Sequence, residues 1–285
     1  MRSSAIRIRY AATMKRMIFL LAIIGTPAAA HQGKPDVVVE GRGLASPADA
    51  REYVTQITDT SHGQVARFQA PVCPVVVGLS DEANARISAR IRDTARSLGA
   101  EVAPQNCDAN LVVLVTDDAG ASLAELRRTQ SDSFYGLSPS EIDALAADSS
   151  PVRSWAVVSV RNEDGDRVHE NDDKNQAGAM RVKSASILRS ATRLDIDGSF
   201  ILIDRAAVSG KTVTQIADYA AMRGLARIRA PRTSSPASIL TLFSGSGAAP
   251  GLTWSDKAYL QALYKFSGRE SVAEARSRLS RVLTR

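Results

Sequence analysis

The stretch "VCPVVVGLSDEANARISARIRDTARSLG" (72–99), followed by "NLVVLV" (110–115), decides the fold of this chain. Its first eight residues form an apolar, β-branched run that is typical of a buried strand. Ser80 then caps a helix that carries Asp81 and Glu82 in its first turn, where carboxylates interact favourably with the helix dipole. A glycine ends this helix, and a second apolar run follows. The order strand, helix, strand predicts two parallel neighbours in one sheet.

Beyond this unit, helical and strand-like patterns alternate along the chain. We expect helices around 46–59, 211–225, 252–266 and 271–283, and two short helices within 119–148. We expect strands around 154–160, 180–188 and 199–204, and a turn at "DIDG" (195–198). The helix that follows Ser80 carries four arginines, Arg86, Arg90, Arg92 and Arg96. We expect them on a solvated face, with a ligand patch as the alternative. The pattern predicts an α+β fold with a mixed, mostly parallel sheet, flanking helices and a helical C-terminal half.

Residues 1–30 have the three parts of a secretory signal. A basic start is followed by the apolar run "MIFLLAIIG" (17–25) and by "TPAAA", an A-x-A match that ends at Ala30. Cleavage near Ala30 predicts an exported protein, periplasmic or secreted; the alternative is an uncleaved anchor, and Met1 and Met14 are both candidate starts. The apolar run is shorter than the roughly 20 residues of a membrane-spanning helix. No later segment is apolar enough, so we predict no membrane span in the mature chain.

The domain organisation follows from these patterns. We predict a signal peptide at 1–30, a leader with one helix at 31–70, and one domain at 71–285 that divides into subdomains at 71–225 and 226–285. Export places Cys73 and Cys107 in an oxidising compartment, and each flanks a strand-like run. We predict a disulfide bond between them, with two unpaired buried thiols as the alternative.

The net charge of +6 does not indicate a nucleic-acid partner. Residues 1–30 hold five basic residues and no acidic one, so 36 − 5 leaves 31 basic residues against 30 acidic ones after cleavage. A mature chain so close to neutrality exerts no overall attraction on polyanions. We therefore predict no nucleic-acid binding.

Several motifs that carry chemistry fail on spacing. The three histidines, His31, His62 and His169, are scattered along the chain, whereas a zinc site needs three or four well-placed ligands. The stretch around Lys211 lacks the earlier glycine of a phosphate-binding loop, and the chain contains no Gly-x-Ser-x-Gly nucleophile elbow. We predict neither a metal nor a cofactor.

The stretch "ADYAAMRGLAR" (217–227) resembles the HExxHxxGxxH helix of the metzincin proteases with its metal ligands replaced. Ala217 and Ala221 fall at the first two histidines, and Asp218 falls at the glutamate. Gly224 matches the glycine, and Arg227 replaces the third histidine.

Two later segments extend this resemblance. "SILTLF" (238–243) is similar to the methionine-containing turn of the family, with Leu240 in place of the methionine, and "LTWSDKAYLQALYK" (252–265) resembles its last helix. The resemblance implies a zincin-like fold over 71–285, and its specific part is 215–265. The chain also resembles exported proteins of alphaproteobacteria whose function is unknown, a likeness that implies no mechanism.

The replaced residues argue against the activity of that family. Alanine cannot bind zinc, and an arginine repels a cation. We expect a non-catalytic, pseudoprotease-like protein that holds an unknown peptide or protein in a retained cleft, by strand addition to the segment 180–188. One alternative is a hydrolase of another class, in which Asp218 and Arg227 meet His62 or His169. A structural envelope protein without a deep pocket is the other, and an unrelated α/β fold is the alternative to the resemblance itself.

Overall fold

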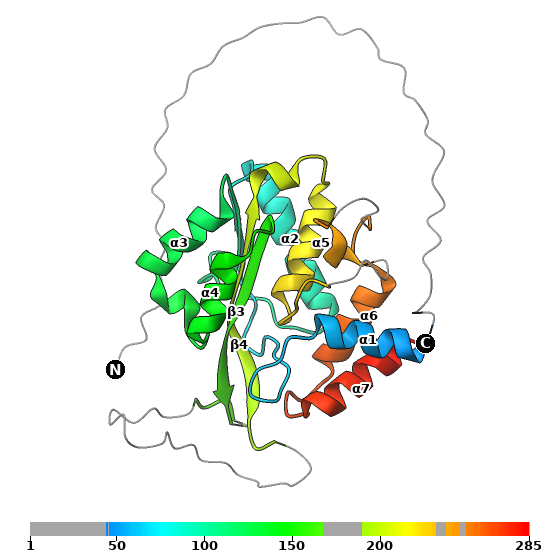
Figure 1. Cartoon of the computed structure of the whole chain (residues 1–285). Helices are drawn as coiled ribbons and strands as arrows, with labels where there is room; N and C mark the ends of the chain where they lie inside the picture. The colour runs from blue at the N-terminus through cyan, green and yellow to red at the C-terminus, as the bar shows by residue number, and fades with distance from the viewer. Residues whose placement is uncertain are drawn as a thin grey trace, which may run out of the picture. The chain divides into compact units, whose positions relative to one another are not determined.

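The computed structural model describes residues 44, 46–162, 164–167, 190–231, 238–244 and 249–284. Over these residues the chain forms seven α-helices and one four-stranded sheet (Figure 1). The strands are β1 (Pro74–Val77), β2 (Leu111–Thr116), β3 (Val152–Arg161) and β4 (Arg193–Asp204). The helices are α1 (Pro47–Ile57), α2 (Asp81–Ser97), α3 (Ala119–Thr129), α4 (Pro139–Ala147), α5 (Val213–Gly224), α6 (Trp254–Tyr264) and α7 (Val272–Val282). This mixed content is consistent with the predicted α+β class.

The strands lie in the order β1-β2-β4-β3. β1 pairs with β2 and β2 pairs with β4 in parallel, while β3 runs antiparallel to β4 at one edge of the sheet. The prediction that the strands flanking 80–99 are parallel neighbours is confirmed. The crossover between them is α2, whose N-cap Ser80 accepts a hydrogen bond from the Ala83 backbone N–H.

Helices cover both faces of the sheet. In Figure 1, α2 and α5 lie on one side of the strands, and α3 and α4 lie on the other. The larger core lies on the side of the sheet that α2 and α5 cover, and it extends to the C-terminal helices. It includes Ile91 of α2, Ile201 of β4 and Leu260 of α6. The smaller core lies under α3, where the ring of Trp155 stacks between Phe134 and Phe200.

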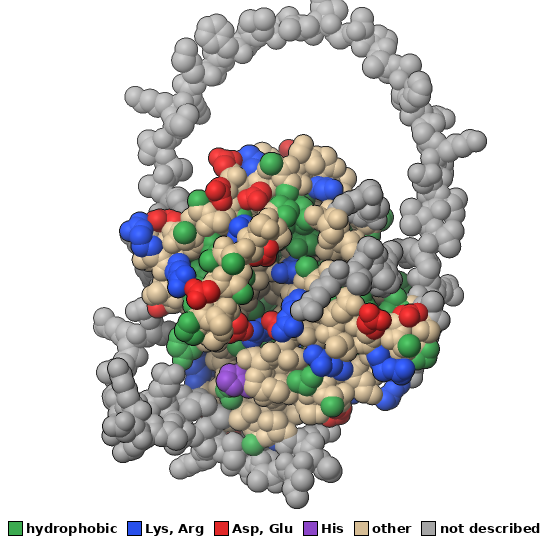
Figure 2. Space-filling model, viewed as in Figure 1, with side chains coloured by type: hydrophobic (Ala, Val, Ile, Leu, Met, Phe, Trp, Pro, Cys, Tyr) green, Lys and Arg blue, Asp and Glu red, His purple; other side chains and the backbone are tan. Residues whose placement is uncertain are grey.

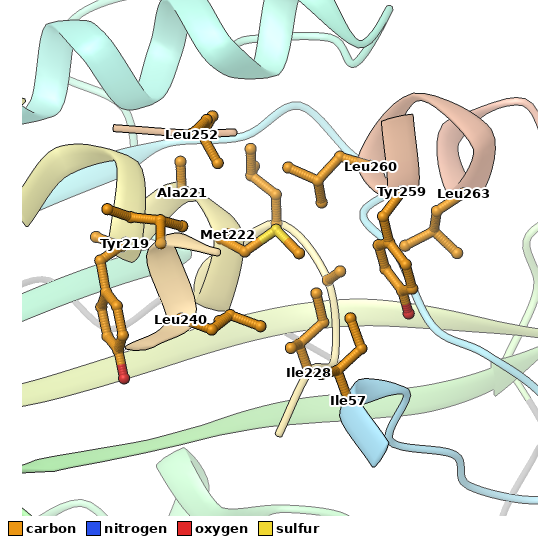
Figure 3. Close-up of a cluster of buried hydrophobic side chains, with 14 of the residues drawn as sticks. Ile57, Tyr219, Ala221, Met222, Ile228, Leu240, Leu252, Tyr259, Leu260 and Leu263 are labelled. Atoms are coloured by element: carbon orange, nitrogen blue, oxygen red, sulfur yellow. The ribbon is translucent and has the colours of Figure 1, made fainter. Parts of the chain in front are cut away.

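Small residues let α5 pack closely on the sheet. A Cβ atom at Gly224 would lie 2.9 Å from Leu111 Cδ1 and 3.2 Å from Ile201 Cδ1, so this glycine contacts β2 and β4 directly. Ala217 and Ala221 precede Gly224 by seven and three positions, and residues at these spacings share one face of a helix. Both alanines are fully buried, and Figure 3 shows Ala221 within a cluster of apolar side chains.

Several helices begin at a side chain that caps them with a specific hydrogen bond. Ser46 caps α1, and Ser138 caps α4 in a capping box with Glu141. Thr212 and Thr253 begin α5 and α6 in the same way. Because each cap satisfies backbone N–H groups that a helix leaves open, these short side chains fix where the helices begin.

One local prediction is wrong. Residues 195–198 form no turn, because β4 already begins at Arg193 and pairs with β3 on both sides of Asp197. Asp195 and Asp197 are tolerated in a strand because Arg161 forms ion pairs with both of them across the two strands. A β-bulge between Val157 and Val158 accommodates this extension. The predicted strand at 180–188 lies outside the described residues.

The predicted disulfide bond is present. Cys73 and Cys107 are joined, with Cα atoms 6.1 Å apart and a separation of 34 positions in the sequence. The bond ties the start of β1 to the segment that leads into β2. None of the helices over the described residues has both the length and the apolar character of a membrane span.

Candidate functional site

A cavity of about 620 Å³ lies between β3, α4 and α5. Its lining also includes the segment 226–230, which follows α5, and residues of the turn 240–244. Figure 2 shows basic and acidic side chains close together near the centre of one face of the molecule. The cavity therefore combines strand backbone, helix side chains and charges in one place, as ligand sites commonly do.

One wall of the cavity is the outer edge of β3. The Asp204 N–H donates to the Pro151 carbonyl oxygen (2.9 Å), so these two residues form a hydrogen-bonded pair just before the β3–β4 ladder. Hydrogen-bonded pairs alternate along an antiparallel ladder. The backbone N–H and C=O groups of Val152, Ser154 and Ala156 therefore point away from β4. All three residues line the cavity, and β3 has no second strand neighbour among the described residues.

The opposite wall carries two side chains of α5, Tyr219 and Arg223. They are four residues apart and so share one helix face. Arg223 Nε donates to Ser154 Oγ at 2.8 Å, and its Nη2 donates to the same oxygen. The Tyr219 ring meets Phe243 edge-on at 4.8 Å between centroids, and burial raises the pKa of its phenol.

Arg227 joins three segments at the rim of the cavity. Its Nε lies 2.7 Å from Asp59 Oδ2 after α1, and its Nη2 lies 2.7 Å from Glu141 Oε1 of α4. Arg229 also donates to Asp59. Burial acts to raise the pKa of Glu141, but hydrogen bonds from Ser138 and the Arg227 guanidinium outweigh it and hold that pKa below its usual range.

The six positions suggested by the metzincin resemblance are not brought together around this cavity. Arg227 and Leu240 line it. Ala217 and Ala221 are fully buried and do not line it, and Gly224 packs against β2 and β4. Figure 3 shows Tyr219 and Ala221 leaving the helix in different directions.

Asp218, the sixth position, lies on a third side of α5. Its carboxylate is fully buried and accepts hydrogen bonds from Arg90 Nε (2.5 Å) and Nη2 (2.8 Å) of α2 and from the Leu252 backbone N–H (2.8 Å). Asp218 and Arg227 therefore do not pair with each other, and Arg90 is not simply a solvated charge. Asp218 is a structural anchor between α2, α5 and the start of the C-terminal helices.

The turn that contains Leu240 is held in place by hydrogen bonds to the Asp256 carboxylate. This buried carboxylate accepts hydrogen bonds from Ser238 Oγ (2.6 Å), the Ile239 N–H (2.9 Å) and both the N–H and hydroxyl of Thr253. One side chain thus positions a turn of the cavity wall and caps α6 at the same time.

His62, one of the two candidate histidines of a non-zinc hydrolase, does not lie beside Asp218. His62 lines a separate cavity of about 360 Å³ with Tyr135 and Arg167, and His169 lies outside the described residues. Over the part of the chain that the structure describes, no three His, Cys, Asp or Glu side chains are grouped so that they could hold a metal ion.

Sequence reasoning missed the residues that face the cavity, Tyr219, Arg223 and Ser154. A usable signal was present in "ADYAAMRGLAR". Ala217, Ala221 and Gly224 are small and lie on one side of α5, as expected of a helix face that packs closely. Tyr219 and Arg223, which are larger and four residues apart on another side, were therefore the better candidates for a site. The pairing of α5 with Ser154 of β3, 69 positions earlier, has no local sequence signal.

Comparison of the chain with protein-family models, with curated proteins and with solved structures found no match.

Proposed function

We propose that this protein is an exported, non-catalytic binding protein that holds an extended peptide in the cavity between β3 and α5. The single observation that carries the proposal is the outer edge of β3, where Ser154 and Ala156 line the cavity and have no strand partner among the described residues. An extended peptide can add to such an edge through main-chain hydrogen bonds. The edge strand predicted at 180–188 is replaced in this proposal by β3.

The resemblance to metzincins supports a zincin-like origin for the fold. Its support is the antiparallel edge strand beside α5, together with the turn at Leu240 that lines the same cavity. In this proposal the metzincin motif is aligned with α5 two residues later than in the sequence analysis, so that its ligand positions face the cavity. Tyr219 and Arg223 then stand, four residues apart, where the first two histidines of the motif would stand.

The chemistry of these two positions supports a non-catalytic role. The guanidinium of Arg223 is always charged and repels a metal cation. The Tyr219 phenol is buried and its pKa is raised, which favours the protonated form over a phenolate ligand. The export part of the proposal rests on the signal-like sequence at 1–30. The cavity itself argues against a structural envelope protein with smooth surfaces.

The test measures zinc content and peptide binding on the same purified protein. A random array of extended peptides is screened, and amide hydrogen exchange is then recorded with the strongest binder. We expect no stoichiometric zinc, and slower exchange at Ser154 and Ala156 when peptide is bound. One zinc ion per chain, or a bound peptide that leaves the exchange of β3 unchanged, would contradict the proposal.

A further inference from the structure

Arg223 has hydrogen-bonding capacity that the protein itself does not use. Of the three arginines that line the cavity, Arg227 and Arg229 form ion pairs with carboxylates. Arg223 donates only to the neutral hydroxyl of Ser154, through Nε and Nη2. Among the described residues no carboxylate lies within ion-pair distance of it. Because a guanidinium has five N–H donors, its Nη1 group remains available.

The acidic residues of the cavity are already engaged by other groups. Asp59 accepts from Arg227 and Arg229, and Glu141 accepts from Arg227. Asp148 accepts from the Ser150 N–H (2.8 Å) and hydroxyl (3.0 Å). Over the described residues, Arg223 is therefore the one cavity arginine without a carboxylate partner.

The guanidinium of Arg223 is also held in a fixed position. The Ser154 hydroxyl on β3 accepts hydrogen bonds from it. The Cζ atom of Arg223 lies 6.0 Å from the centroid of the Tyr219 ring, at the limit of a cation–π contact. Phe243 holds the Tyr219 ring in turn. A group that is ordered before binding loses less entropy on binding, so this cation is preorganised for a ligand.

We propose that Arg223 binds a carboxylate of the extended peptide, supplied by an acidic side chain or by the peptide C-terminus. The inference rests on the proposed function, because it needs a strand paired with β3. Residues opposite each other in neighbouring strands place their side chains on the same face of a sheet. The Ser154 side chain reaches Arg223, so the peptide residue opposite Ser154 points to the same side. A carboxylate there matches the planar fork of the guanidinium.

The experiment compares charged and neutral forms of the same peptide. The strongest binder from the array is resynthesised with each Asp or Glu changed to Asn or Gln, and separately with its C-terminal carboxylate amidated. Binding to the full chain is measured by calorimetry for the wild type, for Arg223→Met and for Arg86→Met. Arg86 is a matched control, because it is an exposed arginine of α2 away from the cavity.

We expect neutralisation of one carboxylate to weaken binding to the wild type by about 10- to 100-fold, the range of a hydrogen bond to a charged group. The same change should have no effect in Arg223→Met and the full effect in Arg86→Met. A loss with the side-chain amide identifies an acidic side chain, and a loss with the amidated end identifies the peptide C-terminus. Either result supports the carboxylate assignment.

Three outcomes separate the two proposals. Neutral and acidic forms that bind equally, or a loss that persists in Arg223→Met, overturn the carboxylate proposal and leave strand addition to β3 standing. If no peptide binds, both the strand-addition proposal and the carboxylate proposal are contradicted. If Arg223→Met does not fold, the pKa of the isotope-labelled peptide carboxylate is measured with the wild type. It should fall on binding, and an unchanged pKa overturns the carboxylate proposal.

Discussion

The pair formed by Asp218 and Arg90 shows how one residue can stabilise a fold without taking part in a site. Asp218 is fully buried, while the Arg90 side chain is 46% exposed. The arginine thus keeps part of its hydration while it neutralises a carboxylate that has none. Gly251 passes so close that a Cβ atom there would lie 2.5 Å from Asp218 Oδ2. The two contacts together hold the chain before α6 against α2 and α5.

Removal of Arg90 should therefore be costly. We expect Arg90→Met to lower the free energy of unfolding by about 2 to 3 kcal/mol, because the buried carboxylate keeps only the Leu252 N–H as a partner. Urea denaturation of the purified protein measures this loss. Arg86→Met, one turn earlier on α2, breaks only an exposed pair with Glu82 and should change stability by about 0.5 kcal/mol or less. Equal losses in the two variants would contradict the structural role of Asp218.

The disulfide bond acts at the scale of elements, because it joins the start of β1 to the chain before β2 across the whole of α2. We expect the double variant Cys73→Ala, Cys107→Ala to lose about 3 to 4 kcal/mol, on the chain-entropy estimate for a loop of this length. The denaturant m-value should rise, since the unfolded chain becomes less compact. Unchanged stability in non-reducing denaturation would refute this. Reduced wild type provides the control, and its curve should match that of the variant.

Local signals predicted most elements because those signals are contained in a few consecutive residues. The cap Ser80 and the apolar runs of β1 and β2 could be recognised without knowledge of the rest of the chain. β4 was predicted too short, because the pairing of Asp195 and Asp197 with Arg161 spans more than 30 positions. The parallel order of the strands could be inferred from the crossover helix.

The site was harder to predict than the fold for the same reason. Its residues come from β3, α4, α5 and two later segments, and their approach depends on packing rather than on spacing. Reading "ADYAAMRGLAR" against a motif gave the correct helix but chose Ala217 and Ala221, which are fully buried and do not line the cavity. Burial of small residues in a packed stripe looks, in a single sequence, the same as loss of metal ligands.

At the scale of the whole molecule, acid should weaken the contact between the C-terminal helices and the rest of the domain. Glu270, in the connection between α6 and α7, accepts hydrogen bonds from the Ser267 N–H (3.0 Å), the Gly268 N–H (3.0 Å) and Arg278 (3.1 Å). Burial acts to raise the pKa of Glu270, but hydrogen bonds from the Ser267 N–H and hydroxyl and from the backbone N–H of Glu270 itself, together with the charge of Arg278, outweigh it and lower the pKa below its usual range. Gly268 in turn accepts a hydrogen bond from Gln64, far away in the sequence.

Because the folded-state pKa of Glu270 lies below that of the unfolded chain, its stabilisation is complete above pH of about 4.3 and is lost as the pH falls through the folded-state value. We expect Glu270→Gln to be less stable than the wild type at pH 7 and to show a shallower loss of stability in acid. Denaturation at a series of pH values measures both effects. Glu101→Gln, an exposed carboxylate, should follow the wild-type curve. A Glu270→Gln curve parallel to that of the wild type would contradict the assignment.

The sheet has a second margin, β1, and the two margins differ in what they offer to another chain. β1 has only four residues and starts with Pro74, which has no N–H to donate, whereas β3 has ten. Short strands and prolines at an edge discourage runaway pairing between copies. A second copy of the chain therefore finds fewer backbone partners along β1 than along β3, which limits edge-to-edge assembly of the sheet on that side.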